Sequence, residues 1–290
     1  MTSDDRPVLR VGCPMWAHRP WVGRHLPADT PNGEELPAYA TWCTAVEGNT
    51  SFYALPAAST VERWAEQAPE GFRFCFKVPR TVTHERRLRD AGAEVRDLLV
   101  RLDPLGDRLG PTQVQLPPSF GPEELWVLDE FLGGLPADWS WAVEVRHPGF
   151  FAGGAAERPL DDLLTRHGAN RVILDSRALF DRPPETPMEI EAWDRKPRLP
   201  VRPVATGDQP IVRLIGRSDV AASLERWAPW WPKAAQWLAE GRQPILFAHT
   251  PDNVDAPPLA RAVHAKVAEL VADLTPLPEP ATAEVQLGLF

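Results

Sequence analysis

The stretch Val8-Leu-Arg-Val-Gly-Cys-Pro-Met-Trp16 joins the first strand-like run of the chain to the turn that follows it. Val8–Cys13 is short, mainly apolar and flanked by prolines, as strands buried in a parallel sheet often are. A doubly wound dinucleotide-binding sheet would place a GxGxxG turn here, and Gly12–Trp16 lacks that pattern. The first turn therefore favours a barrel over an open, doubly wound sheet.

Further runs of the same kind follow along the chain, and helical patterns lie between them. The strand-like runs are Thr44–Asn49, Phe72–Val78, Pro111–Leu116, Ser140–Arg146, Arg171–Asp175, Pro210–Ile215 and Pro244–His249. The helical patterns are a capping box at Ser59-Thr-Val-Glu62, then Pro122–Leu132, Leu160–His167, Ala222–Ala239 and Pro258–Leu274. Strands alternating with helices in this way predict a single-domain α/β fold, the (β/α)8 TIM-type barrel. We expect Ser176–Val204 to be an elaborated loop at the mouth of the barrel.

The composition is that of a globular protein. The 290 residues are 43% hydrophobic and 24% charged, which excludes wholesale disorder. No run of 18 apolar residues occurs, and the N-terminal MTSDDRPVLR does not have the pattern of a signal peptide. Three cysteines without CxxC spacing indicate neither a disulfide framework nor a zinc ribbon, so we expect a cytoplasmic protein. The net charge of −9 argues against a surface coated with positive charge for nucleic acid, but not against a local basic groove.

Polar residues stand at the ends of most of these runs, where a TIM barrel places its catalytic groups. We expect side chains from different strands to converge there in one cleft. The residues expected to act as catalytic groups or metal ligands are Glu47, Lys77, His84, Glu144 and Asp175. Those expected to bind substrate are Trp16, Trp21, Asn49, Tyr53, Gln115, Arg146, His147, Arg177, Arg213 and His249.

The segment Phe72-Arg-Phe-Cys-Phe-Lys77 shows how one of these groups is placed. Its phenylalanines share one face of a strand, while Cys75 and Lys77 share the other. A lysine at the end of so apolar a strand needs a carboxylate partner or has a lowered pKa. Glu47 or Glu144 could provide that partner from across the barrel. The structural alternative is a buried ion-pair network that only closes the barrel mouth.

A metal site is weakly indicated. Glu47, His84, Glu144, Asp175 and His249 are suitable ligand types, but no HxH or HExxH motif links them. The sequence therefore leaves a divalent metal cofactor open. His84 itself is either such an active group or part of a loop whose threonine caps a helix and whose arginines are solvated.

Six segments of the chain together resemble the YecE-like family of bacterial proteins. They are Val46-Glu-Gly-Asn-Thr-Ser-Phe-Tyr53, Phe72-Arg-Phe-Cys-Phe-Lys77, Gln115-Leu-Pro-Pro118, Glu144-Val-Arg-His-Pro148, Val172-Ile-Leu-Asp-Ser-Arg177 and Phe247-Ala-His-Thr-Pro-Asp252. The similarity runs in order from Gly12 to about Leu274. It implies a TIM barrel and no particular reaction.

The C-terminal segment is rich in Pro, Ala and Glu, so we divide the chain into a barrel domain over 1–274 and an extended, mobile tail over 275–290. The tail ends in Gln286-Leu-Gly-Leu-Phe290, which resembles the pentapeptide that docks bacterial polymerases and repair proteins on the β sliding clamp. The resemblance implies that Leu287, Leu289 and Phe290 enter an apolar pocket of the clamp while Gln286 makes orienting hydrogen bonds. The alternative is that these side chains pack on the barrel itself.

Two classes of enzyme fit these features. The first is a nucleic-acid-processing protein of DNA repair or replication, which the clamp delivers to single-stranded or damaged DNA and which acts by carboxylate or metal-assisted phosphodiester chemistry. The second acts on a small carbohydrate-like or phosphorylated metabolite, with Glu47 and Glu144 as paired carboxylates. A non-catalytic barrel that only binds its ligand is a third option. Salt-dependent DNA binding would separate the first class from the others.

Overall fold

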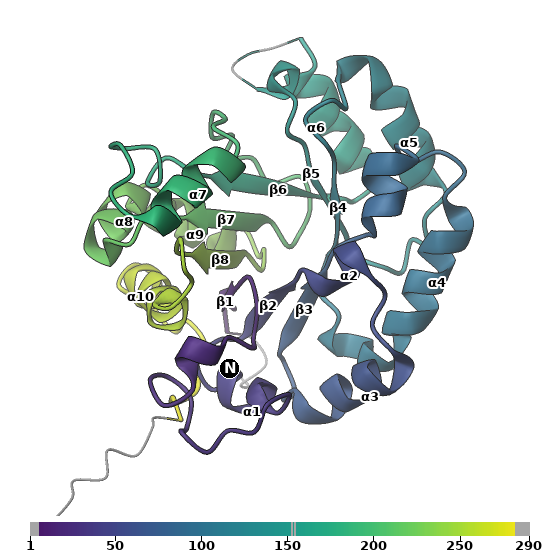
Figure 1. Ribbon diagram of the computed structural model, residues 1–290. Helices are drawn as coiled ribbons and strands as arrows, with labels where there is room; N and C mark the ends of the chain where they lie inside the picture. The colour runs from purple at the N-terminus through teal and green to yellow at the C-terminus, as the bar shows by residue number, and fades with distance from the viewer. Residues whose placement is uncertain (1–5, 152, 154, 282–290) are drawn as a thin grey trace, which may run out of the picture.

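The computed structural model describes residues 6–151, 153 and 155–281. Within these residues, eight parallel strands form a barrel with helices around its outside (Figure 1). The strands are β1 (Arg10–Cys13), β2 (Ala45–Gly48), β3 (Arg73–Phe76), β4 (Thr112–Gln115), β5 (Trp141–Glu144), β6 (Asn170–Asp175), β7 (Ile211–Ile215) and β8 (Ile245–His249). They pair in the order β3-β2-β1-β8-β7-β6-β5-β4. The predicted (β/α)8 TIM-type fold is confirmed.

The barrel closes between β3 and β4, the two strands at the ends of this order. There the N–H of Val78 donates to the carbonyl of Gln113 at 2.9 Å, and the N–H of Gly110 donates to the carbonyl of Phe74 at 2.8 Å. Lys77 and Gln113 form an isolated parallel bridge at the same place. By contrast, β7 and β8 are paired at five successive positions. The junction of β3 with β4, which we call the seam, is therefore the less regular of these two pairings.

Helices separate most of the strands and bury the outward faces of the barrel. They are α1 (Glu35–Tyr39), α2 (Thr50–Tyr53), α3 (Ala58–Gln67), α4 (Gly92–Leu102), α5 (Leu125–Gly133), α6 (Glu157–Arg166), α7 (Pro187–Arg195), α8 (Val220–Trp227), α9 (Trp230–Ala239) and α10 (Ala256–Ala268). Because successive side chains of a strand point to opposite faces, each strand is buried both against these helices and inside the barrel. None of the helices in the described part of the chain has the length and hydropathy needed to span a bilayer.

Some details of the helices differ from the sequence-based expectations. Ala57, not Ser59, occupies the N-cap of α3, and no side chain caps this helix, so the predicted capping box is wrong. The single helix expected over Ala222–Ala239 is divided into α8 and α9, because Pro229 has no N–H to continue the hydrogen-bond ladder. The long segment between β6 and β7, expected as an elaborated loop, contains α7.

The side chains inside the barrel form layers with different chemistry. Midway along the barrel, small and apolar side chains make one cluster, namely Ala45, Cys75, Ala142, Val172, Ile211, Ile245 and Phe247. Toward the C-terminal ends of the strands, the inward side chains are polar and buried. We call these the polar ring, which consists of Glu47, Lys77, Gln115, Glu144, Arg213 and His249. The apolar cluster is the floor beneath this ring.

Residues 275–281 lie against the barrel. The N–H of Thr275 donates to the carbonyl of Pro7 at 3.0 Å, and the N–H of Ala281 donates to the hydroxyl of Thr41 at 2.8 Å. Ordered contacts thus continue past the predicted start of the tail, as far as the description reaches. The predicted clamp-binding residues Gln286, Leu287, Leu289 and Phe290 lie outside the described residues, and their role stays a prediction.

Candidate functional site

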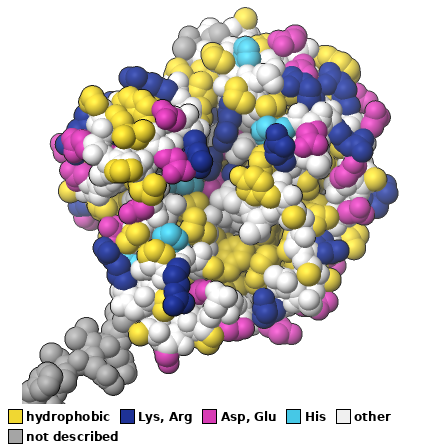
Figure 2. Space-filling model, viewed as in Figure 1, with side chains coloured by type: hydrophobic (Ala, Val, Ile, Leu, Met, Phe, Trp, Pro, Cys, Tyr) yellow, Lys and Arg dark blue, Asp and Glu magenta, His cyan; other side chains and the backbone are white. Residues whose placement is uncertain are grey.

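A cavity of about 750 Å³ opens above the polar ring, at the C-terminal ends of the strands. The space-filling view shows the surface hollowed near its centre, with Lys and Arg side chains along the hollow (Figure 2). Among the described residues, the basic side chains that line the cavity are Lys77, Arg146, Arg195, Lys196 and Arg213, and the acidic ones are Glu191 and Asp252. When Glu47 and Glu144 of the polar ring are counted as well, cations outnumber anions around the cavity by five to four.

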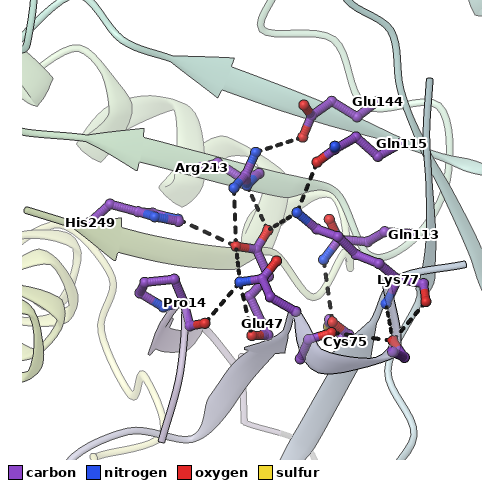
Figure 3. Close-up of polar contacts among 12 residues, drawn as sticks. Pro14, Glu47, Cys75, Lys77, Gln113, Gln115, Glu144, Arg213 and His249 are labelled. Carbon is purple, nitrogen blue, oxygen red and sulfur yellow. Dashed lines mark hydrogen bonds and ion pairs between the residues drawn. The ribbon is translucent and has the colours of Figure 1, made fainter. Parts of the chain in front are cut away.

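Arg213 lies at the centre of the polar ring, between Glu47 and Glu144 (Figure 3). Its Nε is 2.6 Å from Oε1 of Glu47, and its Nη1 donates to Oε2 of Glu144 at 2.8 Å. Burial alone would lower the pKa of Arg213, but the two carboxylates raise it above its usual value. All three side chains are almost fully buried, so each charge depends on the others for stabilisation.

Both carboxylates of the ring are ionised at neutral pH. Burial would raise the pKa of each, but Arg213 and Lys77 hold the pKa of Glu47 far below its usual range. The pKa of Glu144 falls to about 2 because Arg146, whose Nε donates to its Oε1 at 2.6 Å, and Arg213 outweigh burial. Neither group holds a proton to donate at neutral pH, so a glycosidase-type acid–base pair would lack its acid.

Lys77 and His249 complete the ring. Nζ of Lys77 donates to Oε1 of Gln115 at 2.8 Å and lies 3.7 Å from Oε1 of Glu47. Burial lowers the pKa of Lys77 to about 8, and Arg213 acts in the same direction. Nε2 of His249 is 3.6 Å from Glu47, and burial holds the pKa of His249 well below its usual range, so its imidazole is neutral. Lys77 thus has both features expected from the sequence, a carboxylate partner and a lowered pKa.

Lys196 lines the cavity from the segment that follows α7, and the sequence analysis did not select it. Among the described residues, no group forms a hydrogen bond or ion pair with its Nζ. Burial and the positive charge of Arg213 together lower the pKa of Lys196 to about 8. Residues 194–200 carry three basic side chains, Arg195, Lys196 and Arg198, but the sequence does not show which of them faces the cavity, because that depends on where α7 ends.

The family model described as "Protein of unknown function DUF72" matches residues 10–283. The chain belongs to the DUF72 family. The Escherichia coli K12 protein "UPF0759 protein YecE" is 39% identical over 271 residues, which are 93% of this chain and 97% of that protein. The "UPF0759 protein YunF" of Bacillus subtilis is 32% identical over 119 residues, 39% of this chain and 41% of the relative. The YecE-like resemblance seen in the sequence is therefore confirmed.

Solved DUF72 structures share the fold. A DUF72 protein of Enterococcus faecalis superposes with a TM-score of 0.65 at 19% identity, covering 91% of this chain and 97% of that one. A DUF72 protein of Thermotoga maritima gives a TM-score of 0.65 at 21% identity, covering 91% and 98%. At such identities the likeness concerns the barrel and not its chemistry.

In this DUF72 protein Asp175 lies apart from the polar ring, contrary to the expectation that it would share the cleft with Glu47 and Glu144. Its carboxylate accepts hydrogen bonds from Nε1 of Trp230 and from Nη2 of Arg177, each at 2.7 Å. The preceding residue, Leu174, lines the cavity. Strand alternation therefore turns Asp175 outward, toward α9.

The aromatic residues predicted to bind substrate have different surroundings. Trp21 is fully buried and stacks on Tyr39 at 5.9 Å, so it is part of the core and offers no free face. Trp16 packs edge-on against Trp64 at 4.9 Å and is not among the residues that line the cavity. Tyr53 does line the cavity, at its mouth, and is 80% exposed.

The other predicted residues fall into two groups. Asn49, Gln115, Arg146, Arg213 and His249 line the cavity, as expected. His84 packs edge-on against Phe52 at 5.2 Å, and burial together with Arg146 lowers its pKa to about 4. His147 accepts a hydrogen bond from the N–H of Gly149 at 3.1 Å and caps a short helix. His84, His147 and Arg177 are not among the cavity-lining residues.

The donor set of the site fits an anion better than a cation. Within the described part of the chain, no group of three His, Cys, Asp or Glu side chains is placed to hold a metal ion. The carboxylates of the polar ring, Glu47 and Glu144, already neutralise Arg213, Lys77 and Arg146. A metal ion would have to compete with these cations for the same oxygens.

Proposed function

We propose that this protein is an enzyme that acts on a small phosphorylated metabolite bound above the polar ring. The observation that supports this proposal is the excess of basic over acidic side chains around the cavity, in a chain whose net charge is −9. A local concentration of positive charge in an otherwise acidic protein attracts an anion to that place. The cavity volume of about 750 Å³ is within the range usual for small-molecule sites.

The polar side chains that line the cavity are of two kinds, cations that can bind a phosphate and neutral groups that can hydrogen-bond to the rest of the ligand. A phosphate monoester carries between one and two negative charges near neutral pH, and its oxygens accept several hydrogen bonds. Arg146 and Lys196 face the cavity and can donate to such oxygens. Asn49, Gln115 and His249 are neutral polar groups beside them, suited to hydroxyl and carbonyl groups of the same ligand.

The proposal is tested by binding of simple phosphates. We expect inorganic phosphate, pyrophosphate and sugar phosphates to raise the melting temperature of the parent protein. Lys196→Met should weaken the affinity for phosphate about tenfold in calorimetric titrations, because one charged hydrogen bond is lost. Lys266→Met removes an exposed lysine on α10 and should leave the affinity unchanged. A parent protein that binds none of these anions, or equal weakening by both variants, would exclude the site.

We also propose a second function, which the sequence of the C-terminus supports. The pentapeptide Gln286–Phe290 would dock the protein on the β sliding clamp and bring the barrel to single-stranded or damaged DNA, with the cationic cavity receiving a phosphodiester. The double variant Leu289→Ala/Phe290→Ala should abolish clamp binding and leave the melting temperature unchanged. DNA binding that weakens steeply with salt would support this function. Absence of binding to clamp and DNA by the parent would refute it.

A further inference from the structure

We propose that Lys196 is a nucleophile that captures the carbonyl carbon of a phosphorylated aldehyde or ketone as a Schiff base. This inference rests on the proposed function: Arg146 holds the phosphate group of the substrate, and Lys196, which binds free phosphate in its protonated form, reacts with the carbonyl carbon in its neutral form. It adds the class of substrate and the first covalent step. The support comes from the chemistry of the cavity wall, the surroundings of the two cavity lysines, and the charge of the site.

The cavity wall offers few nucleophiles. Among the described residues that line it, none is Cys, Ser or Thr. The free cysteines Cys13, Cys43 and Cys75 are all fully buried. The groups left that can form a covalent bond with a substrate are the amines of Lys77 and Lys196, the imidazoles, the phenol of Tyr53 and the carboxylates of Glu191 and Asp252. Of these, only the two primary amines form imines with carbonyl compounds, so they suit the wall to carbonyl chemistry.

The two lysines differ in what their amines already contact. Nζ of Lys77 is held by Gln115 and lies beside the Glu47 carboxylate, which favours its protonated form. Its side chain is only 5% exposed. Lys196 has no such partner among the described residues, and its side chain lies at the cavity surface. Both amines have a pKa lowered to about 8, so access is what distinguishes Lys196: it lies at the cavity surface, and no group among the described residues holds its amine.

The charges around Lys196 keep its amine reactive. Burial and the cations Arg213 and Arg146 lower its pKa, whereas Glu47 and Glu144 raise it, and the result is a pKa of about 8. At pH 8 about half of such amines are neutral, against less than about 1% for a lysine of ordinary pKa. A desolvated lysine beside another cationic group is a recurrent means of activating an amine for imine formation.

The step balances without a further reactant. The nitrogen lone pair of Lys196 forms a C–N bond while the carbonyl π electrons move to oxygen. The carbinolamine then loses that oxygen as water, which takes one proton from the nitrogen and one from solvent. The product is a protonated imine. Its positive charge replaces that of the lysine, and the substrate phosphate offsets it.

The test uses pyridoxal 5′-phosphate solely as a probe that carries both an aldehyde and a phosphate. The folded protein is incubated with the probe and reduced with sodium borohydride, and the modified lysines are mapped by peptide mass spectrometry. The chain has four lysines, Lys77, Lys196, Lys233 and Lys266, so Lys233 and Lys266 outside the cavity are internal references. We expect Lys196 to be labelled at least about tenfold faster than these two, with a rate that rises with pH through about 8.

Two comparisons separate this inference from the proposed function. Lys196→Arg keeps the charge but cannot form an imine, so it should still be stabilised by phosphate while losing the reduced adduct at this position. Excess inorganic phosphate should slow labelling of Lys196 in the parent, and pyridoxal without its phosphate should label it at least about tenfold more slowly. Phosphate binding with no preferential adduct at Lys196 would overturn the Schiff base alone. Absence of phosphate binding would overturn the proposed function.

Discussion

Two buried arginines of this protein make similar ion pairs in different surroundings. Arg213 points into the barrel and lies between Glu47 and Glu144. Arg171 points outward from β6, and its Nη1 donates to Oδ1 of Asp161 on α6 at 2.5 Å. Both arginines are less than 5% exposed, and both contact carboxylates. Burial and pairing alone therefore do not distinguish a site from a structural contact.

The balance of charge does distinguish them. The outer network has two cations and two anions, namely Arg171 and Arg202 with Asp161 and Glu157. The inner network and the adjoining cavity wall together have five cations, Lys77, Arg146, Arg195, Lys196 and Arg213, and four anions, Glu47, Glu144, Glu191 and Asp252. In the outer network the positive and negative charges balance. The inner network has an excess of positive charge, and the cavity beside it can hold an anion that balances this excess.

Among the substitutions that distinguish the two networks, Arg213→Met should cause the largest loss in the free energy of unfolding. It leaves two buried carboxylates without their central partner, and breaking buried pairs of this kind costs about 3–5 kcal/mol. Arg171→Met should cost less, because it takes a cation from one carboxylate, Asp161, which keeps Arg202 at 2.9 Å. Arg213→Met takes a cation from two carboxylates and leaves Glu47 with Lys77 at 3.7 Å. Urea unfolding of both variants measures the difference. Equal losses would mean that Glu47 and Glu144 find other partners as readily as Asp161 does.

Acid should act on the inner network through Glu144. Because the folded state lowers its pKa from 4.5 to about 2, the unfolded chain binds more protons between these values. The contribution of Glu144 to the free energy of unfolding is complete above about pH 4.5 and is lost as the pH falls toward about 2, a change of about 3 kcal/mol. Glu144→Gln should flatten this part of the curve of unfolding free energy against pH. An unchanged acid limb in that variant would contradict the prediction.

Trp230→Phe tests whether Asp175 belongs to the outer layer. The substitution removes the indole N–H that donates to Asp175, a bond to a charged group worth about 1.5–3 kcal/mol. The free energy of unfolding should fall by about that amount, while the affinity for phosphate, measured by calorimetry, stays constant. A loss of phosphate affinity would place Asp175 within the functional site after all.

Tyr53→Ala should have the smallest effect on stability. The side chain is 80% exposed, so the change in unfolding free energy should stay within about 0.5 kcal/mol. Because Tyr53 lies at the cavity mouth, the variant should bind an aromatic phosphate such as pyridoxal 5′-phosphate less tightly and inorganic phosphate equally well. Equal weakening of both ligands would indicate that Tyr53 shapes the cavity rather than contacting the ligand.

Most of the barrel and of the polar ring could be predicted, because strand ends and alternation are local properties of the sequence. Lys77 shows this, since phenylalanines mark the opposite face of its strand. Asp175 could not be placed in this way. The run before it, Val172-Ile-Leu174, is apolar on both faces, as a strand buried on both sides must be, so the pattern does not show which face each residue occupies.

Loop residues were harder to place because their positions depend on packing far along the chain. Lys196 reaches the cavity only because α7 ends at Arg195 and turns the next residue inward. From the sequence, Trp21 was expected to stack on a ligand. In the structure its indole Nε1–H donates to the backbone carbonyl of Asn253, which is more than two hundred residues later in the chain. No local pattern contains such a contact.

The seam between β3 and β4 should become more stable when a ligand occupies the cavity, so it offers a way to detect binding. Lys77 and Gln115 lie on its two sides, and their hydrogen bond crosses it. Only a few backbone bonds, among them those of Val78 and Gly110, hold this junction, so brief openings there need less free energy than between fully paired strands. A ligand that contacts both polar side chains would hold the two strands together. The amide protons of Val78 and Gly110 would then exchange with deuterated solvent more slowly, whatever reaction follows.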